Sequence, residues 1–400
     1  MPRVLLIAPT CDGRGVGESW VSYQWAEHLA RRCEVTLVTY HKRNATPASE
    51  QLDGLRVVEW AEPPLLGRAE RFNSIVKPGY LAFYRRARRW IRDAVAAGEH
   101  FDLAFQPTPV AMRYPSPVVG LGIPTIVGPV GGGLPDPEGF SAEGTNEPWY
   151  YRLRELDGLR LRHDPFLRRS YEEADCVLGI ADYVGDALSC LDLRRFEVMP
   201  DVAIAEVPDP VPREPSARVR ALFVGRLVRS KGVHELVDAL AQTRAPVDLD
   251  LAGVGPEEGA LRRRVTDLGL DDRVTFHGWL DRPAVADLYR RADLFAFPSY
   301  REPGGTVTLE AMSWGLPVVV ADRGGPGAFT TDECAIRVPV RSPGQFRHDI
   351  AAALDRLGSD PGLRLSMGRA AREHVMTTAT WSAKCDRLVA LGEEVARVGS

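Results

Sequence analysis

The sequence predicts an α/β protein in which two Rossmann-like domains with parallel sheets face each other across a cleft. Short apolar runs alternate with amphipathic helical patterns, which is typical of parallel strands joined by helices. Residues 200–215 carry five prolines without periodicity and interrupt this alternation near mid-chain. The alternation then restarts, so we expect residues 1–200 and 201–380 to form separate domains.

The composition of the 400-residue chain argues against several classes of function. Its hydrophobic share of 44% is ordinary for a soluble protein with buried cores. The net charge of −4 gives no overall case for nucleic acid as a partner. No apolar run reaches the roughly 18 residues that a spanning helix needs. The six cysteines are scattered without CxxC spacing, which favours reduced thiols in a cytoplasmic protein over disulfides or a zinc site.

The elements of the first domain follow the alternation in order. A strand opens the chain, and a helix with aromatic and aliphatic residues at helical spacing follows over 19–32. An aromatic and basic segment lies over 147–172. We expect strands at Val4–Ala8, Val35–Thr39, Asp102–Phe105, Thr125–Val127 and Cys176–Ile180.

The second domain repeats this pattern after the proline-rich connector. Helices are expected over 232–240 and near 257–268, and a short helix follows the glycine turn after Pro303. The final helical stretch, about 381–397, has no strand left to pair with, so we expect it to pack back on one of the two domains. The expected strands are Arg220–Val224, Asp248–Ala252, Val274–Phe276, Leu294–Phe297 and Val318–Val320.

The stretch Pro298–Val320 is the one around which the site is organised. Glu302 precedes its short helix and Glu310 lies inside it, so the two carboxylates are too far apart to share one helical turn. Backbone N–H groups at the helix start are free to bind an anion or hydroxyl groups. The surrounding prolines and glycines favour a site that holds two parts of one ligand over a pair of surface glutamates.

Two further loops follow strands at the edge where open α/β sheets bind ligands. In Phe223–Gly232, Arg226 and Lys231 flank a helix start and suit a diphosphate; a solvated basic turn is the alternative. The glycines of Asp12–Ser19 allow close approach of a phosphate or substrate. Their spacing is G-x-G-x-G rather than the dinucleotide G-x-G-x-x-G, and a plain βα turn remains the other interpretation.

Three motifs together carry a family resemblance. They are Gly225-Arg-Leu-x3-Lys-Gly232, the Gly278 of Thr275-Phe-His-Gly-Trp-Leu, and Pro298-Ser-x2-Glu-Pro-x-Gly-x4-Glu-Ala-Met-x2-Gly-Leu-Pro-Val318. In this order and spacing, the C-terminal half closely resembles the retaining GT-B glycosyltransferases of family 4 (glycosyl transferases group 1). The N-terminal glycine loop and Gly128–Gly133 resemble the family more loosely. The resemblance implies that residues 381–400 pack back on an acceptor-binding N-terminal domain.

The resemblance also implies roles for individual residues. Arg226 and Lys231 would neutralise the donor diphosphate, and Glu302 would hold the hydroxyls of the donor sugar, so these three are the expected catalytic residues. Glu310 would bind the ribose. The other implied donor-binding positions are Gly15, Gly17, His277, Gly278, Gly304, Gly305 and Thr306, and the implied acceptor-binding positions are Glu18, Gln106, Gly131, Gly132 and Gly133.

Two positions depart from the family pattern. The usual Glu-x-Phe-Gly is Glu302-Pro-Gly-Gly305 here, with Gly304 in place of the aromatic residue. Many members carry an acceptor-facing histidine after the fourth strand, where this chain has Phe105-Gln106-Pro107. Activation of the acceptor would then fall to Gln106, to the Gly131–Gly133 loop or to the leaving phosphate.

The implied function is the transfer of a sugar, with retention of the anomeric configuration, from a nucleoside-diphosphate sugar to a hydroxyl or amine of a carbohydrate or secondary-metabolite acceptor. No metal or other cofactor is expected, because cationic side chains and helix-end amides can stabilise the departing anion. The alternatives are a catalytically silent sugar-nucleotide binder and a transferase for lipid-linked acceptors at a membrane surface. A GT-B-like epimerase or phosphorylase is a further rival, but the pyridoxal lysine that a phosphorylase needs has no evident pattern.

Two other sequence patterns resemble functional motifs, but each is better explained by ordinary structure. Asp248-Leu-Asp250 imitates a D-x-D metal motif, but it lies inside a strand pattern where both carboxylates share one face. The cluster Arg85–Arg92 is basic nearly all round a helix. This favours a solvated face, or a contact with an acceptor phosphate, over peripheral binding to a membrane.

Overall fold

The computed structural model describes residues 1–41, 45–62, 79–140, 156–212 and 218–398, which form two compact units. Unit 1 comprises Met1–Gly133, Pro148–Asp201 and Trp381–Ser400, and unit 2 comprises Leu134–Glu147 and Val202–Thr380. The sequence predicts that residues 134–147 belong to the first domain. The described part of this segment belongs to unit 2 because Phe140 packs on Tyr300 and Phe346, with ring centroids 4.6 and 5.9 Å away.

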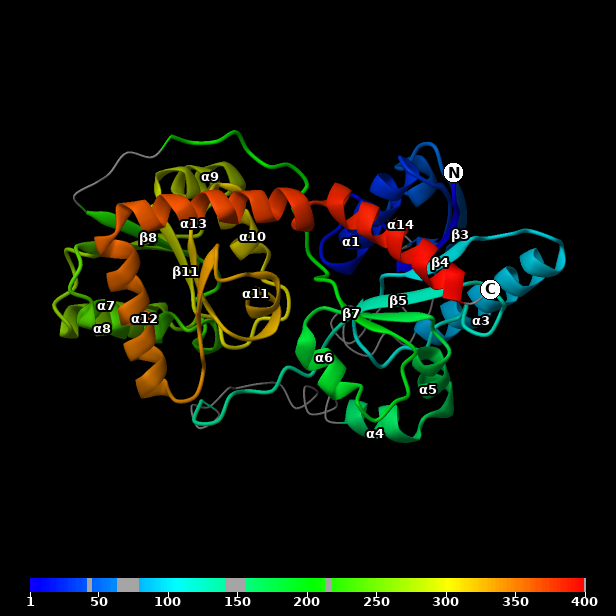
Figure 1. The fold of residues 1–400 in the computed structure, drawn as a ribbon, viewed down its shortest axis with the longest axis horizontal. Helices are drawn as coiled ribbons and strands as arrows, with labels where there is room; N and C mark the ends of the chain where they lie inside the picture. The colour runs from blue at the N-terminus through cyan, green and yellow to red at the C-terminus, as the bar shows by residue number, and fades with distance from the viewer. Residues whose placement is uncertain (42–44, 63–78, 141–155, 213–217, 399–400) are drawn as a thin grey trace. The chain divides into compact units, whose positions relative to one another are not determined.

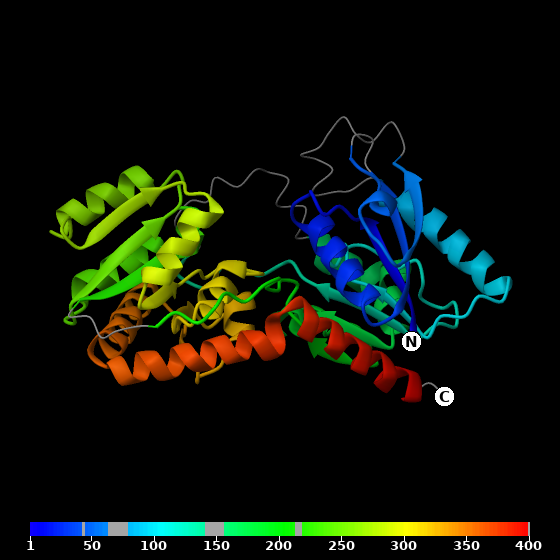
Figure 2. The same ribbon diagram turned by 90° about the horizontal axis from the view of Figure 1, so that it is seen from above.

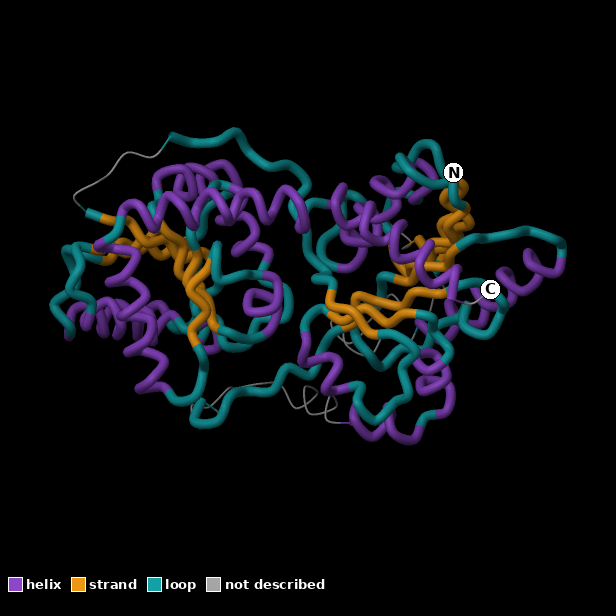
Figure 3. Tube along the Cα trace, viewed as in Figure 1, coloured by secondary structure: helices purple, strands orange, loops and turns teal. Residues whose placement is uncertain are grey.

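Unit 1 is built on a parallel sheet with strand order β3-β2-β1-β4-β5-β6-β7. Its central strands are almost entirely apolar because helices lie on both faces of the sheet (Figure 3). Leu5, Leu6 and Ile7 of the first strand are fully buried. The strands are β1 (Arg3–Thr10), β2 (Glu34–His41), β3 (Arg56–Ala61), β4 (Leu103–Gln106), β5 (Thr125–Val130), β6 (Cys176–Gly179) and β7 (Phe196–Val198).

The helices of unit 1 use narrow apolar faces to cover this sheet. In the helix of the arginine cluster, Phe83, Ala87 and Ile91 are buried at helical spacing against the β2 side of the sheet (Figure 2). A 3₁₀ turn, η1, spans Ala48–Glu50. The helices are α1 (Glu18–Ala30), α3 (Tyr80–Ala96), α4 (Leu156–His163), α5 (Pro165–Glu172), α6 (Asp182–Ala187) and α14 (Trp381–Val398).

Helix α14, the last in the chain, packs on α1 within unit 1 (Figure 1). The Trp381 ring is fully buried and meets Trp25 edge-on, with centroids 5.4 Å apart. Arg32 pairs with Asp386 at 2.5 Å on the rim of this contact. An apolar centre with a charged rim therefore holds the end of the chain on the N-terminal unit.

Unit 2 has a second parallel sheet, with strand order β10-β9-β8-β11-β12-β13. Helices α7, α8 and α12 lie on one face of this sheet, and α9, α10 and α11 lie on the other (Figure 1). The strands are β8 (Val219–Val224), β9 (Val247–Ala252), β10 (Val274–Gly278), β11 (Leu294–Phe297), β12 (Val318–Ala321) and β13 (Ala335–Val338). The helices are α7 (Val233–Gln242), α8 (Glu258–Asp267), α9 (Arg282–Arg291), α10 (Thr306–Ser313), α11 (Gly324–Phe329), α12 (Pro343–Ser359) and α13 (Pro361–His374), followed by a π-helical turn, η4 (Val375–Ala379).

The predicted fold class, parallel α/β sheets in two domains, is confirmed by these two sheets. Each strand named from the sequence is present, with ends that move by a few residues. Several elements of the structure were not predicted from the sequence, among them the strands β3, β7 and β13. The aromatic residues Trp149–Tyr151 of the aromatic and basic segment, and Pro215 of the connector, lie outside the described residues. Within the described parts of the chain, none of the helices combines the length and apolar character that a bilayer crossing needs.

Candidate active site

Two loops at the carboxyl edge of the unit 2 sheet touch backbone to backbone. Gly232 ends the loop after β8 in a left-handed conformation (φ 69°) and caps α7. A Cβ on Gly232 would lie 2.1 Å from the carbonyl oxygen of Pro298, which follows β11, so only glycine permits this approach. The Ser299 hydroxyl donates to the Ser230 carbonyl oxygen at 3.1 Å. The structure therefore brings together two motifs that lie about 70 residues apart in the sequence.

Lys231 and Glu302 form an ion pair where these two loops meet, with Lys231 Nζ donating to Glu302 Oε2. Their side chains are 20% and 14% exposed, so both charges are largely desolvated yet remain in reach of solvent. The ammonium group also lies 5.3 Å from the centroid of the Phe297 ring, a cation–π distance. The second carboxylate oxygen of Glu302 accepts the Gly304 N–H at 3.3 Å. A cation, a carboxylate and a backbone turn are thus fixed together just before α10.

The turn that carries Glu302 is supported by residues that were not among the predicted site residues. The Gly325 N–H donates to the Glu302 carbonyl oxygen at 2.9 Å. The backbone of α11 approaches so closely that a Cβ on Gly324 would lie 2.2 Å from the same oxygen. The available signal was the pair Gly324-Gly325 soon after β12, since glycines after a strand mark close backbone approach.

Glu310 occupies a different environment on the second turn of α10. The Tyr289 hydroxyl, from α9, contacts both Glu310 Oε2 at 3.1 Å and the Val307 carbonyl oxygen at 3.2 Å. Burial raises the pKa of Glu310 above its ordinary value, and the Tyr289 hydroxyl partly offsets this rise. Tyr289 itself is buried and was not selected from the sequence. Glu310 is therefore a partly buried acceptor that keeps oxygen lone pairs for a ligand.

Arg226 and the glycine-capped helix complete the cationic side of the site. Gly305 (φ 85°) caps α10 at Thr306, so the first N–H groups of this helix have no partner within it. The Arg226 side chain is exposed, and within the described residues its guanidinium has no carboxylate partner. These groups offer positive potential at the same sheet edge as Lys231.

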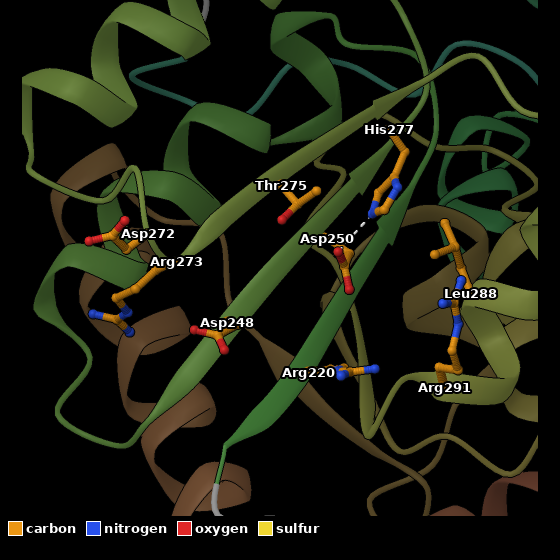
Figure 4. Close-up of a pocket in the computed structure, with 9 residues that line it drawn as sticks. All are labelled: Arg220, Asp248, Asp250, Asp272, Arg273, Thr275, His277, Leu288 and Arg291. Atoms are coloured by element: carbon orange, nitrogen blue, oxygen red, sulfur yellow. Dashed lines mark hydrogen bonds and ion pairs between the residues drawn. The ribbon is translucent and has the colours of Figure 1, made fainter.

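His277 directs its side chain away from this edge, into a pocket of about 310 Å³ on one face of the sheet (Figure 4). There its Nε2 lies 2.7 Å from Asp250 Oδ1. Only the backbone of His277 and Gly278 remains for the donor-binding role that the sequence implied. The Gly278 carbonyl oxygen accepts the Gly253 N–H at 2.8 Å, which ties the β10 loop to the β9 loop.

The Asp248-Leu-Asp250 motif lies in this same pocket with its carboxylates engaged separately. Asp248 pairs with Arg218, and Asp250 pairs with His277. Both side chains lie on one face of β9, as the strand pattern predicted (Figure 4). Among the described residues, no group of three or more His, Cys, Asp or Glu side chains is arranged to hold a metal ion.

In unit 1, three loops at the carboxyl ends of β1, β4 and β5 meet. Gly17 (φ 65°) caps α1, and the adjacent Glu18 accepts the Val110 N–H at 3.3 Å. The Val110 carbonyl oxygen in turn accepts the Gly131 N–H at 2.6 Å, and Gly131 bridges to Ala111. Of the candidates expected here, Gly17, Glu18 and Gly131 are thus linked through the Val110 loop. Gly15 turns back on Asp12, and Gly132 and Gly133 continue the third loop with positive φ.

Gln106 lies at the end of β4 and is only 3% exposed. Its Nε2 donates to the Tyr80 hydroxyl at 3.1 Å, and that hydroxyl donates to the Pro115 carbonyl oxygen at 2.5 Å. Within the described residues, Gln106 Oε1 has no hydrogen-bond partner. The residue in the position of the family's histidine is therefore held by a buried network.

Two models of known protein families match this chain. A profile described as "Glycosyl transferases group 1" matches residues 209–374, and one described as "Glycosyl transferase 4-like domain" matches residues 16–201. The chain belongs to this glycosyltransferase family. The matched regions contain the residues that build both groups of loops, apart from Asp12–Gly15 just before the N-terminal match.

Individual relatives extend this family assignment. The D-inositol 3-phosphate glycosyltransferase of Arthrobacter sp. (strain FB24) is 37% identical over 167 residues, which is 40% of this chain and 39% of that protein. The chain thus aligns with less than half of the length of such curated relatives.

Solved structures resemble this member of the glycosyl transferases group 1 over its full length. Sucrose-phosphate synthase from Thermosynechococcus elongatus has a TM-score of 0.61 at 22% identity, covering 100% of both chains. Anabaena HepE in complex with UDP and glucose has a TM-score of 0.57 at 17% identity, covering 98% of this chain and 100% of HepE. The fold is therefore GT-B, as the sequence predicted.

Proposed function

We propose that this chain is a metal-independent, anomer-retaining glycosyltransferase. It transfers a sugar from a nucleoside-diphosphate sugar to a hydroxyl or amine of a carbohydrate or secondary-metabolite acceptor. The observation that carries this proposal is the Lys231–Glu302 ion pair, fixed beside the N-terminus of α10 by the contact of Gly232 with Pro298. Such a cluster offers charge to an anion and an oxygen acceptor to sugar hydroxyls at the same place.

The leaving nucleoside diphosphate is stabilised by the cationic side of this site. An ammonium group has three N–H donors, and Glu302 uses only part of this capacity, so Lys231 can bind a phosphate oxygen while it keeps its carboxylate partner. The exposed Arg226 and the free N–H groups at Thr306 add positive potential. Together they supply the charge that a divalent cation supplies in other transferases.

The two carboxylates hold different parts of the donor. Glu302 accepts hydrogen bonds from sugar hydroxyls and stabilises the positive charge that develops on the sugar ring as the bond to phosphate breaks. Glu310 accepts hydrogen bonds from the ribose hydroxyls. These bonds would compensate for the solvation that the carboxylate loses through its partial burial. The acceptor binds along the glycine loops of unit 1, with Glu18, Gln106 and Gly131–Gly133 as its candidate contacts.

The comparisons support the class of substrate. The Arthrobacter relative is described as a D-inositol 3-phosphate glycosyltransferase, and HepE was solved with UDP and glucose. These favour a nucleotide-sugar donor and a polar, hydroxyl-rich acceptor. Six free cysteines, five of them buried, favour a reducing compartment, so we expect a cytoplasmic enzyme.

The direct test is a screen of UDP-, GDP-, ADP- and dTDP-sugars by thermal shift, followed by an assay for released nucleoside diphosphate with added acceptors. A true donor at 100 times its dissociation constant should stabilise the fold by about 2.7 kcal/mol. Release that depends on acceptor supports the proposal. Stabilisation without any turnover would identify a silent sugar-nucleotide binder instead, and no stabilisation by any donor would contradict the proposal.

One observation favours a second candidate, transfer to a lipid-linked acceptor at a membrane surface. On α3, Leu81, Arg85, Arg89 and Arg92 are all exposed and recur at the helical spacing of one face. Arginine and an aliphatic residue on one helix face suit anionic headgroups. Binding to phosphatidylglycerol vesicles but not to phosphatidylcholine vesicles, with loss of binding in the triple Arg→Ala variant, would favour this candidate.

A further inference from the structure

Trp279 is an exposed aromatic residue at the edge of the donor site. It follows Gly278 directly after β10, and 73% of its surface is accessible. Indole rings are usually buried for most of their area, because exposing so large an apolar surface to water is unfavourable. At the ligand-binding edge of a sheet, an exposed tryptophan offers a large apolar ring that a ligand can cover.

The loop of Trp279 is joined to the loops after the next two strands by close backbone contacts. A Cβ on Gly253, after β9, would lie 1.9 Å from the carbonyl oxygen of Gly225, after β8. Gly255 makes a similar approach to the Leu227 carbonyl oxygen, at 2.2 Å. The Gly253 N–H completes the chain of contacts with its hydrogen bond to Gly278. The ends of β8, β9 and β10 thus form one continuous edge without intervening side chains.

Within two residues of the end of its strand, each of these three loops carries one exposed residue of distinct chemistry. Arg226 belongs to the β8 loop, Val254, which is 45% exposed, to the β9 loop, and Trp279 to the β10 loop. Neighbouring strands lie about 4.8 Å apart, so the β8 and β10 loops are about 10 Å apart along this edge. A cation at one end and an aromatic plane at the other suit a ligand with an anionic end and a flat ring, which describes a nucleotide.

The other aromatic groups near the end of β10 are engaged elsewhere. The Arg262 guanidinium lies 4.3 Å from the centroid of the Phe276 ring. The His277 ring is held by Asp250 in the pocket on the face of the sheet, as Figure 4 shows. Trp279 is therefore the ring that this loop offers to a ligand at the sheet edge.

We infer that Trp279 is the stacking platform for the nucleobase of the donor, with Val254 beside it as an apolar contact and Arg226 at the diphosphate. This inference rests on the proposed function, and it adds a residue that selects for the presence of a base. Stacking on an aromatic face tolerates different bases, because every base has a π-face. Discrimination among bases would then come from the backbone groups of His277 and Gly278.

The test compares ligands with and without a base on the full-length protein. The affinities of UDP, GDP, ADP, dTDP and inorganic pyrophosphate are measured by calorimetry for the wild type, Trp279→Ala, Trp279→Phe and Arg226→Ala. For whichever nucleotide the wild type binds, Trp279→Ala should weaken binding by about 5- to 150-fold and leave pyrophosphate unaffected. Trp279→Phe should keep most of the affinity, and Arg226→Ala should weaken both kinds of ligand.

Fluorescence supplies a second readout. Nucleotide should quench the tryptophan emission of the wild type, and most of this quenching should vanish in Trp279→Phe, because stacking brings the base onto that indole. Phe166→Ala is the matched control, since Phe166 is 68% exposed on α5 in unit 1 and should change neither measurement. Unaltered melting temperatures would show that each variant is folded.

The outcomes separate this inference from the proposed function. If the wild type binds none of the nucleotides, the proposed function fails and the inference with it. If the wild type binds nucleotide and Trp279→Ala binds it equally well, only the inference is overturned. Equal nucleotide affinity combined with a changed oligomeric state would instead assign Trp279 to a protein interface and would also overturn the inference.

Discussion

The loops at the carboxyl edges of the two sheets differ in the chemical groups that they present. In unit 2, charged side chains lie at the edge, and each of Lys231, Glu302 and Glu310 has a partner in its own unit. In unit 1, the loops contact one another largely through backbone atoms, and the polar side chain below them, Gln106, is buried. A diphosphate requires fixed charges, whereas a backbone-lined loop constrains an acceptor mainly by shape. Charged side chains therefore mark the candidate site in unit 2, whereas the loops of unit 1 present mainly backbone groups.

The largest expected effect follows from removal of the Lys231–Glu302 pair. Lys231→Ala and Glu302→Ala should each lower kcat/KM by about 10²- to 10³-fold, because each removes charge aimed at the developing transition state. The double variant should lose far less than the product of the two single losses, since the residues act as a unit. The measurement is steady-state release of nucleoside diphosphate.

Arg218→Ala provides a control for this prediction. It removes one partner of the exposed Arg218–Asp248 pair in the same unit, and turnover should stay within about twofold of the wild type, since an exposed ion pair contributes little to stability. If Lys231→Ala and Glu302→Ala turned over as fast as this control, the charged loops of unit 2 would not be the source of catalysis, and the contrast with the loops of unit 1 would be wrong.

The next effect concerns the backbone contact that positions the pair. Gly232 and Gly269 have similar left-handed conformations, with φ of 69° and 65°, but a Cβ on Gly269 would meet nothing within 4 Å. Gly269→Ala should therefore cost only the conformational strain, about 1–2 kcal/mol. Gly232→Ala should cost about 1–3 kcal/mol more, because its Cβ would overlap the Pro298 carbonyl oxygen.

Urea unfolding curves of the two alanine variants measure this difference. Activity should also fall in Gly232→Ala at temperatures where the variant is folded, because the β8 and β11 loops would be pushed apart. Equal stability and equal activity of the two variants would mean that the contact at Pro298 does not position the site.

A smaller effect is expected for Glu310→Gln. Burial raises the pKa of Glu310, so the folded state binds its proton more tightly than the unfolded state does. The resulting penalty is fully present above the raised pKa, and it is relieved as the pH falls through that pKa toward the ordinary value of 4.5. Glu310→Gln should therefore raise the melting temperature of the ligand-free protein at pH 7.5, and this gain should shrink as the pH approaches 4.5.

Nucleotide affinity should move in the opposite direction. Loss of a charged acceptor for the ribose should weaken nucleoside diphosphate binding by about tenfold or more, because hydrogen bonds to charged groups contribute about 1.5–3 kcal/mol. Calorimetry at pH 7.5 checks this change. A variant that gained stability and kept full affinity would show that Glu310 is structural and faces no ligand.

The two units differ, for a physical reason, in how far the sequence predicts their functional residues. Apolar runs such as Leu294–Phe297 are local, so strand positions could be predicted well, and two motifs with charged side chains marked the unit 2 site. Contacts that join distant segments could not be read in advance. The Tyr289–Glu310 hydrogen bond and the contact of Gly324 with Glu302 depend on which helix the fold places behind α10.

The same limit applies to Gln106 and to the segment 134–147. From the sequence, Gln106 stood where the family has an acceptor-facing histidine, but its neighbour Tyr80 comes from a helix that begins 26 residues earlier. The attachment of Phe140 to unit 2 depends on Tyr300 and Phe346, which lie far along the chain. Each of these features is a property of tertiary packing rather than of local pattern.

The smallest expected effect is the stability change in Gln106→Met. This substitution keeps the volume of the side chain, removes a buried carbonyl oxygen that has no partner among the described residues, and removes one hydrogen bond to Tyr80. The Tyr80 hydroxyl keeps its bond to the Pro115 carbonyl oxygen, so the two changes should nearly cancel, and stability should stay within about 1 kcal/mol of the wild type. Activity then becomes decisive: a fall in kcat with unchanged nucleotide affinity and unchanged stability would assign Gln106 to acceptor activation. Unchanged kcat would leave activation of the acceptor to the Gly131–Gly133 loop or to the leaving phosphate. Unit 1 would then contribute backbone groups, and no side chain at Gln106, to the reaction.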